Sequence, residues 1–308
     1  MADEVKLPDY QGRKTFDFIL QQVENCISDI RPFFYNVTNF NVETLYNEEF
    51  LEKTRRYLYE RPGIDLIEMA MCDIAYTIVF IGVSWFDLSA LMRIYIKKYN
   101  PIFIHTLLPY ISFIPHPDSV FENVWTEFKQ EHLSSILANL SIDLNENLQD
   151  KSQVPKTHIP TMFDWFTNSK LNEKKYFRYY GGHQFKLGHY YRHLYQSVKY
   201  IDGQKNLSYS EKYEYLKTLR AQLSTPEQYL LFFNTISSLG RPWEFDQINS
   251  KTPLKNFNCY LITKYNFIKN VPDTYFINLI EMKKYYPLVH FEFDDLTEER
   301  IMLQKRFR

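Results

Sequence analysis

Residues 208–240, SYSEKYEYLKTLRAQLSTPEQYLLFFNTISSLG, contain the clearest fold signals in the chain. A serine followed three residues later by a glutamate is the pattern of a capping box, which marks the start of a helix. Ser208 and Glu211 form this pattern, and apolar side chains then recur every three or four residues up to Leu223. The first half of the stretch therefore predicts an amphipathic helix with one inward face.

The second half of the stretch predicts a helix that is buried on all sides. Thr225, Pro226 and Gln228 give the N-cap, the proline at the first helical position and the closing residue of another capping box. Residues 226–239 are apolar almost all round, which is typical of a central helix, and Gly240 is the expected stop.

Helical periodicity continues outward from this stretch. Residues 186–201, KLGHYYRHLYQSVKYI, carry an apolar stripe from Leu187 to Val198, and residues 15–30 repeat apolar side chains at helical spacing. Further helices are predicted at 42–60, 64–82, 85–99, 129–140, 254–269 and 273–285, with short strands only near 286–293. The fold class is therefore all-α, as a multi-helix bundle.

A polar segment divides the chain. Residues 143–160, DLNENLQDKSQVPKTHIP, contain two prolines and few apolar side chains, so they are the expected linker. The linker leaves residues 1–142 as an N-terminal helical region with an open role and residues 161–308 as a C-terminal helical domain.

Composition narrows the class of protein. The 308 residues include 25 Tyr, 25 Phe and 4 Trp but 8 Gly, and we ascribe most of the aromatic excess to AT-rich coding. An apolar share of 45% is enough for a core, which excludes a wholly disordered chain. A net charge of −1 excludes a globally basic, histone-like binder but leaves room for a local basic patch.

The sequence also indicates a compartment. Three widely separated cysteines fit no disulfide framework or metal spacing, and residues 1–14 have no apolar run of a secretory signal. The apolar residues 74–86, IAYTIVFIGVSWF, fall short of the ~20 residues that cross a bilayer, so they predict a buried helix. We expect a cytoplasmic protein with no membrane partner.

Basic residues concentrate in residues 170–199, which hold seven Lys or Arg against one Glu. The predicted helix there places four polar side chains on the face opposite its apolar stripe, namely His189, Arg192, His193 and Gln196. Other basic residues of the cluster are candidates for holding a nucleic-acid backbone, namely Lys174, Lys175 and Lys186.

His189 and Arg192 form the leading candidate catalytic pair. A histidine transfers protons near neutral pH, and an arginine holds a phosphate and stabilises developing negative charge. Cleavage of RNA through its own 2′-hydroxyl requires these two functions and no metal. The alternative is an ordinary solvated helix face.

Residues 178–183, RYYGGH, give a second candidate pair. Arg178 and His183 fit the Arg-x4-His pattern of HEPN-type ribonucleases, which are helical and usually dimeric. Gly181 and Gly182 would, however, break the helix on which that pattern normally lies.

Four polar residues in the stretch 208–240 are further candidates for binding, namely Arg220, Gln222, Glu227 and Asn234. Arg220 lies at the edge of an inward face, so a structural ion pair with Glu227 is the alternative to a functional role. Asn234 would need hydrogen-bond partners if it is buried.

Three blocks of sequence resemble the signature region of phage abortive infection proteins related to AbiC. They are residues 187–202, 215–240 and 261–272, and the resemblance extends over about 176–285. The resemblance places these residues on signature positions: His189, Tyr191, Arg192, Leu194, Tyr195, Arg220, Gln222, Leu223, Ser224, Glu227 and Asn234. It implies defence of a bacterial population against phage, often by halting growth of the infected cell.

The resulting expectation is abortive infection by a metal-independent ribonuclease toxin of HEPN-like type. Phosphate-binding glycine loops and the HExxH, CxxC and GxSxG motifs are missing from the sequence, and we expect no metal and no cofactor. The expected partners are RNA, a phage-encoded trigger protein and a second copy of the chain. The alternatives are a non-enzymatic module that binds a phage or host protein, and a toxin held by a neighbouring antitoxin.

Overall fold

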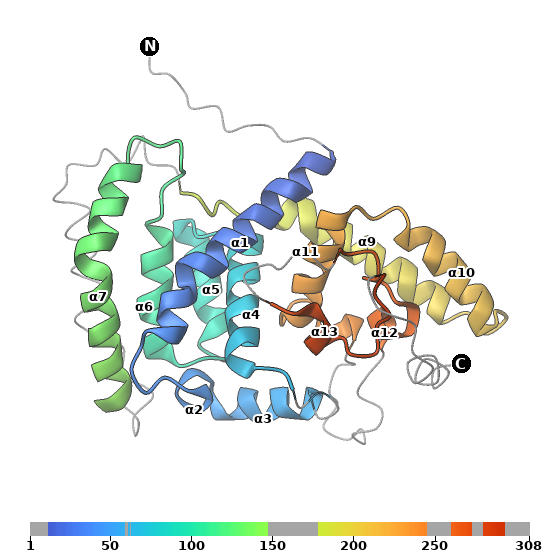
Figure 1. The fold of residues 1–308 in the computed structure, drawn as a ribbon, viewed down its shortest axis with the longest axis horizontal. Coiled ribbons are helices and arrows are strands. Elements are labelled where there is room, and N and C mark those ends of the chain that lie inside the picture. The colour runs from blue at the N-terminus through green and yellow to red at the C-terminus, as the bar shows by residue number, and fades with distance from the viewer. Residues whose placement is uncertain are drawn as a thin grey trace, which may run out of the picture.

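Helix α4 (Leu66–Ile81) is the central element of the fold. The computed structural model describes residues 12–58, 61, 63–146, 178–244, 260–272 and 280–292. In it, α4 packs against α1 (Arg13–Tyr35) and α11 (Thr225–Ile236), which also contact each other (Figure 1). Asp65 begins α4 by accepting hydrogen bonds from the Ile67 and Glu68 amides, and every residue from 69 to 79 is buried.

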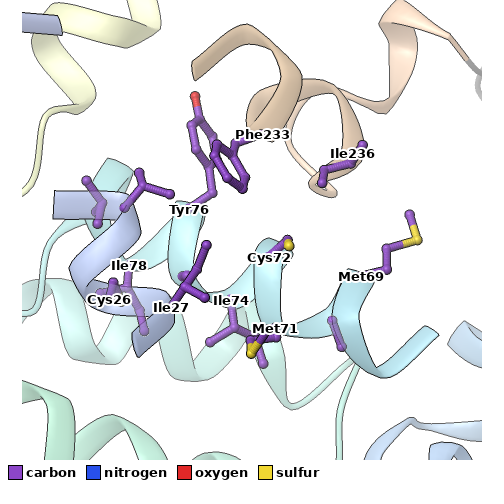
Figure 2. Close-up of a cluster of buried hydrophobic side chains, with 14 of the residues drawn as sticks. Cys26, Ile27, Met69, Met71, Cys72, Ile74, Tyr76, Ile78, Phe233 and Ile236 are labelled. Carbon is purple, nitrogen blue, oxygen red and sulfur yellow. The ribbon is translucent and has the colours of Figure 1, made fainter. Parts of the chain in front are cut away.

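Side chains of these three helices form the core shown in Figure 2. The labelled residues of α1 and α11 that meet α4 are Cys26, Ile27, Phe233 and Ile236. The prediction of a buried helix at residues 74–86 is thus confirmed as a helix for residues 74–81, of which 74–79 are buried. Among the described helices, none combines the length and the apolar character needed to cross a membrane.

Helix α4 ends where a distant segment of the chain crosses it. Gly82 and Gly182 both have positive φ, at 99° and 88°. A β carbon on Gly182 would lie 2.3 Å from the Ile81 carbonyl oxygen. The Val83 amide donates to the Tyr180 carbonyl at 3.0 Å. Only glycine permits this backbone contact, because a side chain would collide with the crossing segment.

The remaining N-terminal helices pack around this core. They are α2 (Val42–Leu45), α3 (Glu48–Tyr57), α5 (Trp85–Tyr95), α6 (Pro101–Ser112) and α7 (Glu122–Glu146). Helix α7 extends beyond the predicted 129–140 and includes residues 143–146 of the predicted linker. The rest of that linker lies outside the described residues, so the division into 1–142, 143–160 and 161–308 stays a prediction.

The C-terminal part begins with α9 (Gln184–Asp202) and α10 (Tyr209–Arg220), followed by α11. The capping box of Ser208 and Glu211 is confirmed. The second box lies one residue earlier than predicted, because Ser224 is the N-cap and Glu227 accepts from its amide and hydroxyl, each at 2.6 Å. Helix α11 is buried as expected, but it ends at Ile236, before Gly240.

Short elements complete the described chain. They are the 3-10 helix η2 (Arg241–Trp243), α12 (Leu261–Tyr265) and α13 (Met282–Tyr285). Left-handed residues at Tyr260 and Asn266 bound α12, so the predicted helix 254–269 is much shorter within the described range. The described residues 286–292 contain no strand. The all-α, multi-helix fold class is confirmed.

Candidate functional site

A pocket of about 460 Å³ opens between α9, the C-terminal end of α11 and η2, and we call it the α9–α11 pocket. Helix α9 supplies most of its wall. The residues that line it are Phe80, Gln184, Phe185, Leu187, Gly188, His189, Tyr191, Arg192, Tyr195, Asn234, Leu239, Gly240, Pro242 and Trp243. Three of the predicted site residues, His189, Arg192 and Asn234, therefore meet in one pocket.

Helix α9 presents His189 and Arg192 to this pocket because of its amphipathic pattern. Leu187 and Tyr191 are buried and line the inner side of the pocket, while His189 and Arg192 line it from the adjoining exposed part of the helix. His189 and Arg192 lie three residues apart, so they are neighbours on the helix surface. Both are exposed, and within the described ranges neither has a hydrogen bond or an ion pair. Both are therefore available to a ligand.

Asn234 lies at the base of the pocket and is buried. Its side-chain amide donates to the Tyr76 hydroxyl of α4 at 3.1 Å. Gly240 packs directly on it, since a β carbon at Gly240 would lie 2.3 Å from both the carbonyl and the side-chain oxygen of Asn234. This contact brings the η2 turn over the end of α11 and forms the wall opposite α9.

Aromatic side chains frame the pocket. Tyr195 and Trp243 meet edge to face, with ring centroids 5.3 Å apart. Phe185 is 90% exposed at the pocket, so its ring is accessible to a ligand. Sequence reasoning missed Phe185 and Trp243 as site residues. Phe185 had a usable signal, because it is an aromatic residue on the polar face of an amphipathic helix.

Arg178 and His183 are held in separate structural contacts. The Arg178 guanidinium donates to the Ser112 carbonyl at the end of α6, at 3.1 Å. His183 is the N-cap of α9, and its Nε2 lies 2.5 Å from the side-chain oxygen of Gln22 on α1. Burial, with a smaller contribution from the charge of Lys186, lowers the pKa of His183 to about 4. Neither residue lines the α9–α11 pocket.

The Arg-x4-His segment also departs from the HEPN pattern in its backbone. Residues 178–183 precede the helix and cross α4 at the glycine contact, so the pattern does not lie on a helix. The HEPN-like interpretation of the C-terminal half therefore stays a prediction.

Arg220 and Glu227 do not form the structural ion pair that the sequence suggested as the alternative to a functional role. Arg220 is buried and donates to the carbonyls of Tyr265 and Asn266, at 3.0 and 2.9 Å. Glu227 caps α11 and accepts a hydrogen bond from the Tyr190 hydroxyl at 2.7 Å. Both residues hold helices together, because the end of α12 and the start of α11 would otherwise have unsatisfied backbone groups.

The other predicted binding residues are distributed over the surface. Lys186, His193, Gln196 and Gln222 are exposed and lie outside the pocket lining. Lys174 and Lys175 lie outside the described residues. No group of three or more His, Cys, Asp or Glu in the described ranges is arranged to hold a metal ion.

The comparison with protein families matches this part of the chain. Residues 182–276 match the family model described as "putative phage abortive infection protein". The AbiC-like resemblance is confirmed. No curated protein and no solved structure matched the chain.

The AbiC-like segment contains every lining residue of the α9–α11 pocket except Phe80. It supports a role in phage abortive infection. Because Phe80 and the Tyr76 partner of Asn234 come from α4, the N-terminal helices complete the pocket from outside the matched segment.

Proposed function

We propose that this protein acts in abortive infection as a metal-independent endoribonuclease with its active site in the α9–α11 pocket. One observation carries the proposal: His189 and Arg192 line the same pocket without internal partners, beside the 90% exposed ring of Phe185. A proton-transfer group and a phosphate clamp are the two functions that cleavage of an RNA strand requires, and an aromatic ring beside them can hold a base by stacking.

The reaction is an internal phosphoryl transfer. His189 accepts the proton of the ribose 2′-hydroxyl as its oxygen attacks the adjacent phosphorus. The bond from phosphorus to the 5′-oxygen breaks, and that oxygen takes a proton from the protonated histidine. The products are a 2′,3′-cyclic phosphate and a 5′-hydroxyl, and the histidine returns to its starting form. Arg192 stabilises the negative charge that grows on the phosphate oxygens.

Phe185 contributes the binding of the base. Stacking of a nucleobase on an aromatic ring contributes about 1–3 kcal/mol and tolerates any base. The ligand would then cover this ring. Lys186, on the same turn of α9, adds positive charge near the strand.

The test compares two histidines of the same helix. We expect His189→Ala to lower RNA cleavage by about 10²–10⁴-fold, in line with loss of a general acid–base group. His193→Ala is the matched control, because His193 is exposed on α9 but lies outside the pocket lining. The measurements are cleavage of labelled RNA by the purified protein and RNA sequencing during phage infection. Cleavage and protection that survive His189→Ala would overturn the proposal.

A non-enzymatic module remains the second candidate, because Phe185 and Leu239 place exposed apolar surface at the rim of the pocket. Such a module would bind a segment of a phage or host protein there. Its expected result is that Phe185→Ser abolishes phage protection while His189→Ala leaves it intact. The ribonuclease predicts loss of protection with both variants.

A further inference from the structure

A second hollow lies on the N-terminal half, outside the AbiC-like segment. It is a groove of about 930 Å³ between α3 and the C-terminal end of α5, and we call it the α3–α5 groove. Four basic side chains line it, namely Lys53, Arg93, Lys97 and Lys98. Glu49 is the one carboxylate that lines it in the described part of the chain. The groove therefore has a positive excess in a protein of near-zero net charge.

The fold builds the floor of this groove from backbone pairing. The Asn47 amide donates to the Lys98 carbonyl at 2.8 Å, and the Asn100 amide donates to the Leu45 carbonyl at 2.7 Å. Phe50 lies on this floor against Tyr99, with ring centroids 6.0 Å apart. These contacts fix the start of α3 against the chain that follows α5, so the basic side chains project from two rigid walls.

Three of the four cations can meet a ligand, although Arg93 Nε also donates to the Ser89 carbonyl of its own helix at 3.2 Å. Lys53, Arg93 and Lys97 are exposed. No ion pair joins any of the three to a carboxylate within the described ranges. Elsewhere on α3, by contrast, Arg55 and Arg56 are paired with Glu43 and Glu52. Among the described basic side chains of α3, the one that faces the groove, Lys53, is thus the one that has no ion pair with a carboxylate.

The fourth cation joins the groove to the rest of the molecule. Lys98 is mostly covered, and its Nζ lies 3.9 Å from the buried carboxylate of Asp73 and contacts the Ser238 hydroxyl. Asp73 also accepts a hydrogen bond from the Ser238 amide at 2.8 Å. Ser238 directly precedes Leu239 and Gly240 of the α9–α11 pocket. The inner end of the groove and one wall of the pocket therefore share a hydrogen-bond network.

We propose that the α3–α5 groove binds the phosphate backbone of a single-stranded nucleic acid. Cations on two walls suit a chain of several phosphates, because each neutralised phosphate releases a counterion. Ile96, which is 38% exposed, adds apolar surface beside these cations. Binding at the groove does not require cleavage at the α9–α11 pocket. The two proposals can be tested separately with a strand that lacks a free 2′-hydroxyl, because such a strand can bind but cannot be cleaved.

The test measures binding of a fluorescein-labelled 2′-O-methyl oligouridylate of ~20 nucleotides to the full chain, by anisotropy at several salt concentrations. The variant is the triple charge reversal Lys53→Glu, Arg93→Glu and Lys97→Glu. The matched control reverses three exposed lysines elsewhere, Lys14→Glu, Lys205→Glu and Lys284→Glu. It changes the net charge equally and so removes any general effect of charge.

We expect the groove variant to bind at least about tenfold more weakly. The plot of log affinity against log salt concentration should become less steep by about 2 units, because three phosphate contacts are lost. The control triple should bind like the unaltered protein. The probe cannot be cleaved, because it lacks a free 2′-hydroxyl, so failure of the catalytic proposal would leave this one standing.

Three outcomes would overturn the proposal. They are equal loss of binding in both triples, no binding of the strand by the unaltered protein, and groove-dependent binding of poly-glutamate without binding of the strand. A neutral triple, Lys53→Gln, Arg93→Gln and Lys97→Gln, guards against misfolding caused by the added acidic residues. Its salt dependence of binding should become less steep by the same amount, while its circular dichroism spectrum stays that of the original protein.

Discussion

Two polar regions of the AbiC-like segment use charged residues in opposite ways. In the first region, which we call the Glu244 junction, Glu244 is fully buried and lies 2.5 Å from Arg61 of the N-terminal half. Glu244 also accepts hydrogen bonds from the Ile262 and Thr263 amides, at 3.1 and 3.2 Å. In the α9–α11 pocket, His189 and Arg192 are exposed and have no such partners in the described ranges. The buried, paired residues of the Glu244 junction stabilise the fold, whereas the exposed, unpaired residues of the pocket are accessible to a ligand.

The largest expected effect breaks the Glu244 junction. Glu244→Ala removes the carboxylate of a buried ion pair, and such a loss destabilises a protein by about 3–5 kcal/mol, because the remaining charge stays in a poorly solvated place. The free energy of unfolding, measured with urea, should fall by that amount. Glu214→Ala is the control, since Glu214 pairs with Lys217 on an exposed face, where removal should change little. Equal effects of the two substitutions would contradict the comparison.

An intermediate effect concerns pH at His183. An unfolded histidine takes a proton below about pH 6.5. The folded protein resists protonation until about pH 4, because burial lowers the pKa of His183. The unfolded state is therefore favoured as pH falls through this window, and up to about 3 kcal/mol of stability is lost.

His183→Gln should remove this loss, since glutamine does not titrate and can still hydrogen-bond to Gln22. The measurement is the free energy of unfolding at pH 7 and at pH 4.5 for both proteins. His193→Gln is the control, because it makes the same substitution at an exposed histidine of the same helix. Parallel curves for the original protein and His183→Gln would refute the prediction.

The smallest expected effect on stability is at the pocket. His189→Ala and Arg192→Ala remove exposed side chains without internal partners, so each should change the free energy of unfolding by less than about 0.5 kcal/mol. Both should nevertheless abolish phage protection if the pocket is the active site. A loss of stability as large as that of Glu244→Ala would place these residues with the structural group instead.

The sequence was sufficient for the helices whose signals are local. The Ser208–Glu211 box and the all-apolar residues of α11 predict their elements correctly, because capping and periodicity depend on neighbouring residues. The second capping box was placed one residue late, since Ser224 with Glu227 and Thr225 with Gln228 satisfy the same pattern. Gln228 is needed elsewhere: its side-chain oxygen accepts a hydrogen bond from the Asn270 amide at 3.0 Å.

The site was predicted only in part, because its remaining contacts are distant in sequence. His189 and Arg192 could be found from one helix face, but the partners of Arg220 lie 45 and 46 residues away, at Tyr265 and Asn266. From the sequence, Gly181 and Gly182 predict only a break in a helix. No local pattern shows that Gly182 instead touches the end of α4 across about 100 residues of chain.

The central position of α4 has a consequence for synthesis on the ribosome. Helix α1, which is made before α4, covers one side of it, and α11, which contacts α1 and is made about 150 residues later, covers the adjoining side. At roughly 5–20 residues per second, this apolar side stays uncovered for on the order of ten seconds. The nascent chain is then a strong candidate for chaperone binding. The α9–α11 pocket cannot assemble until that wait ends, so a translating ribosome carries the protein without its candidate active site.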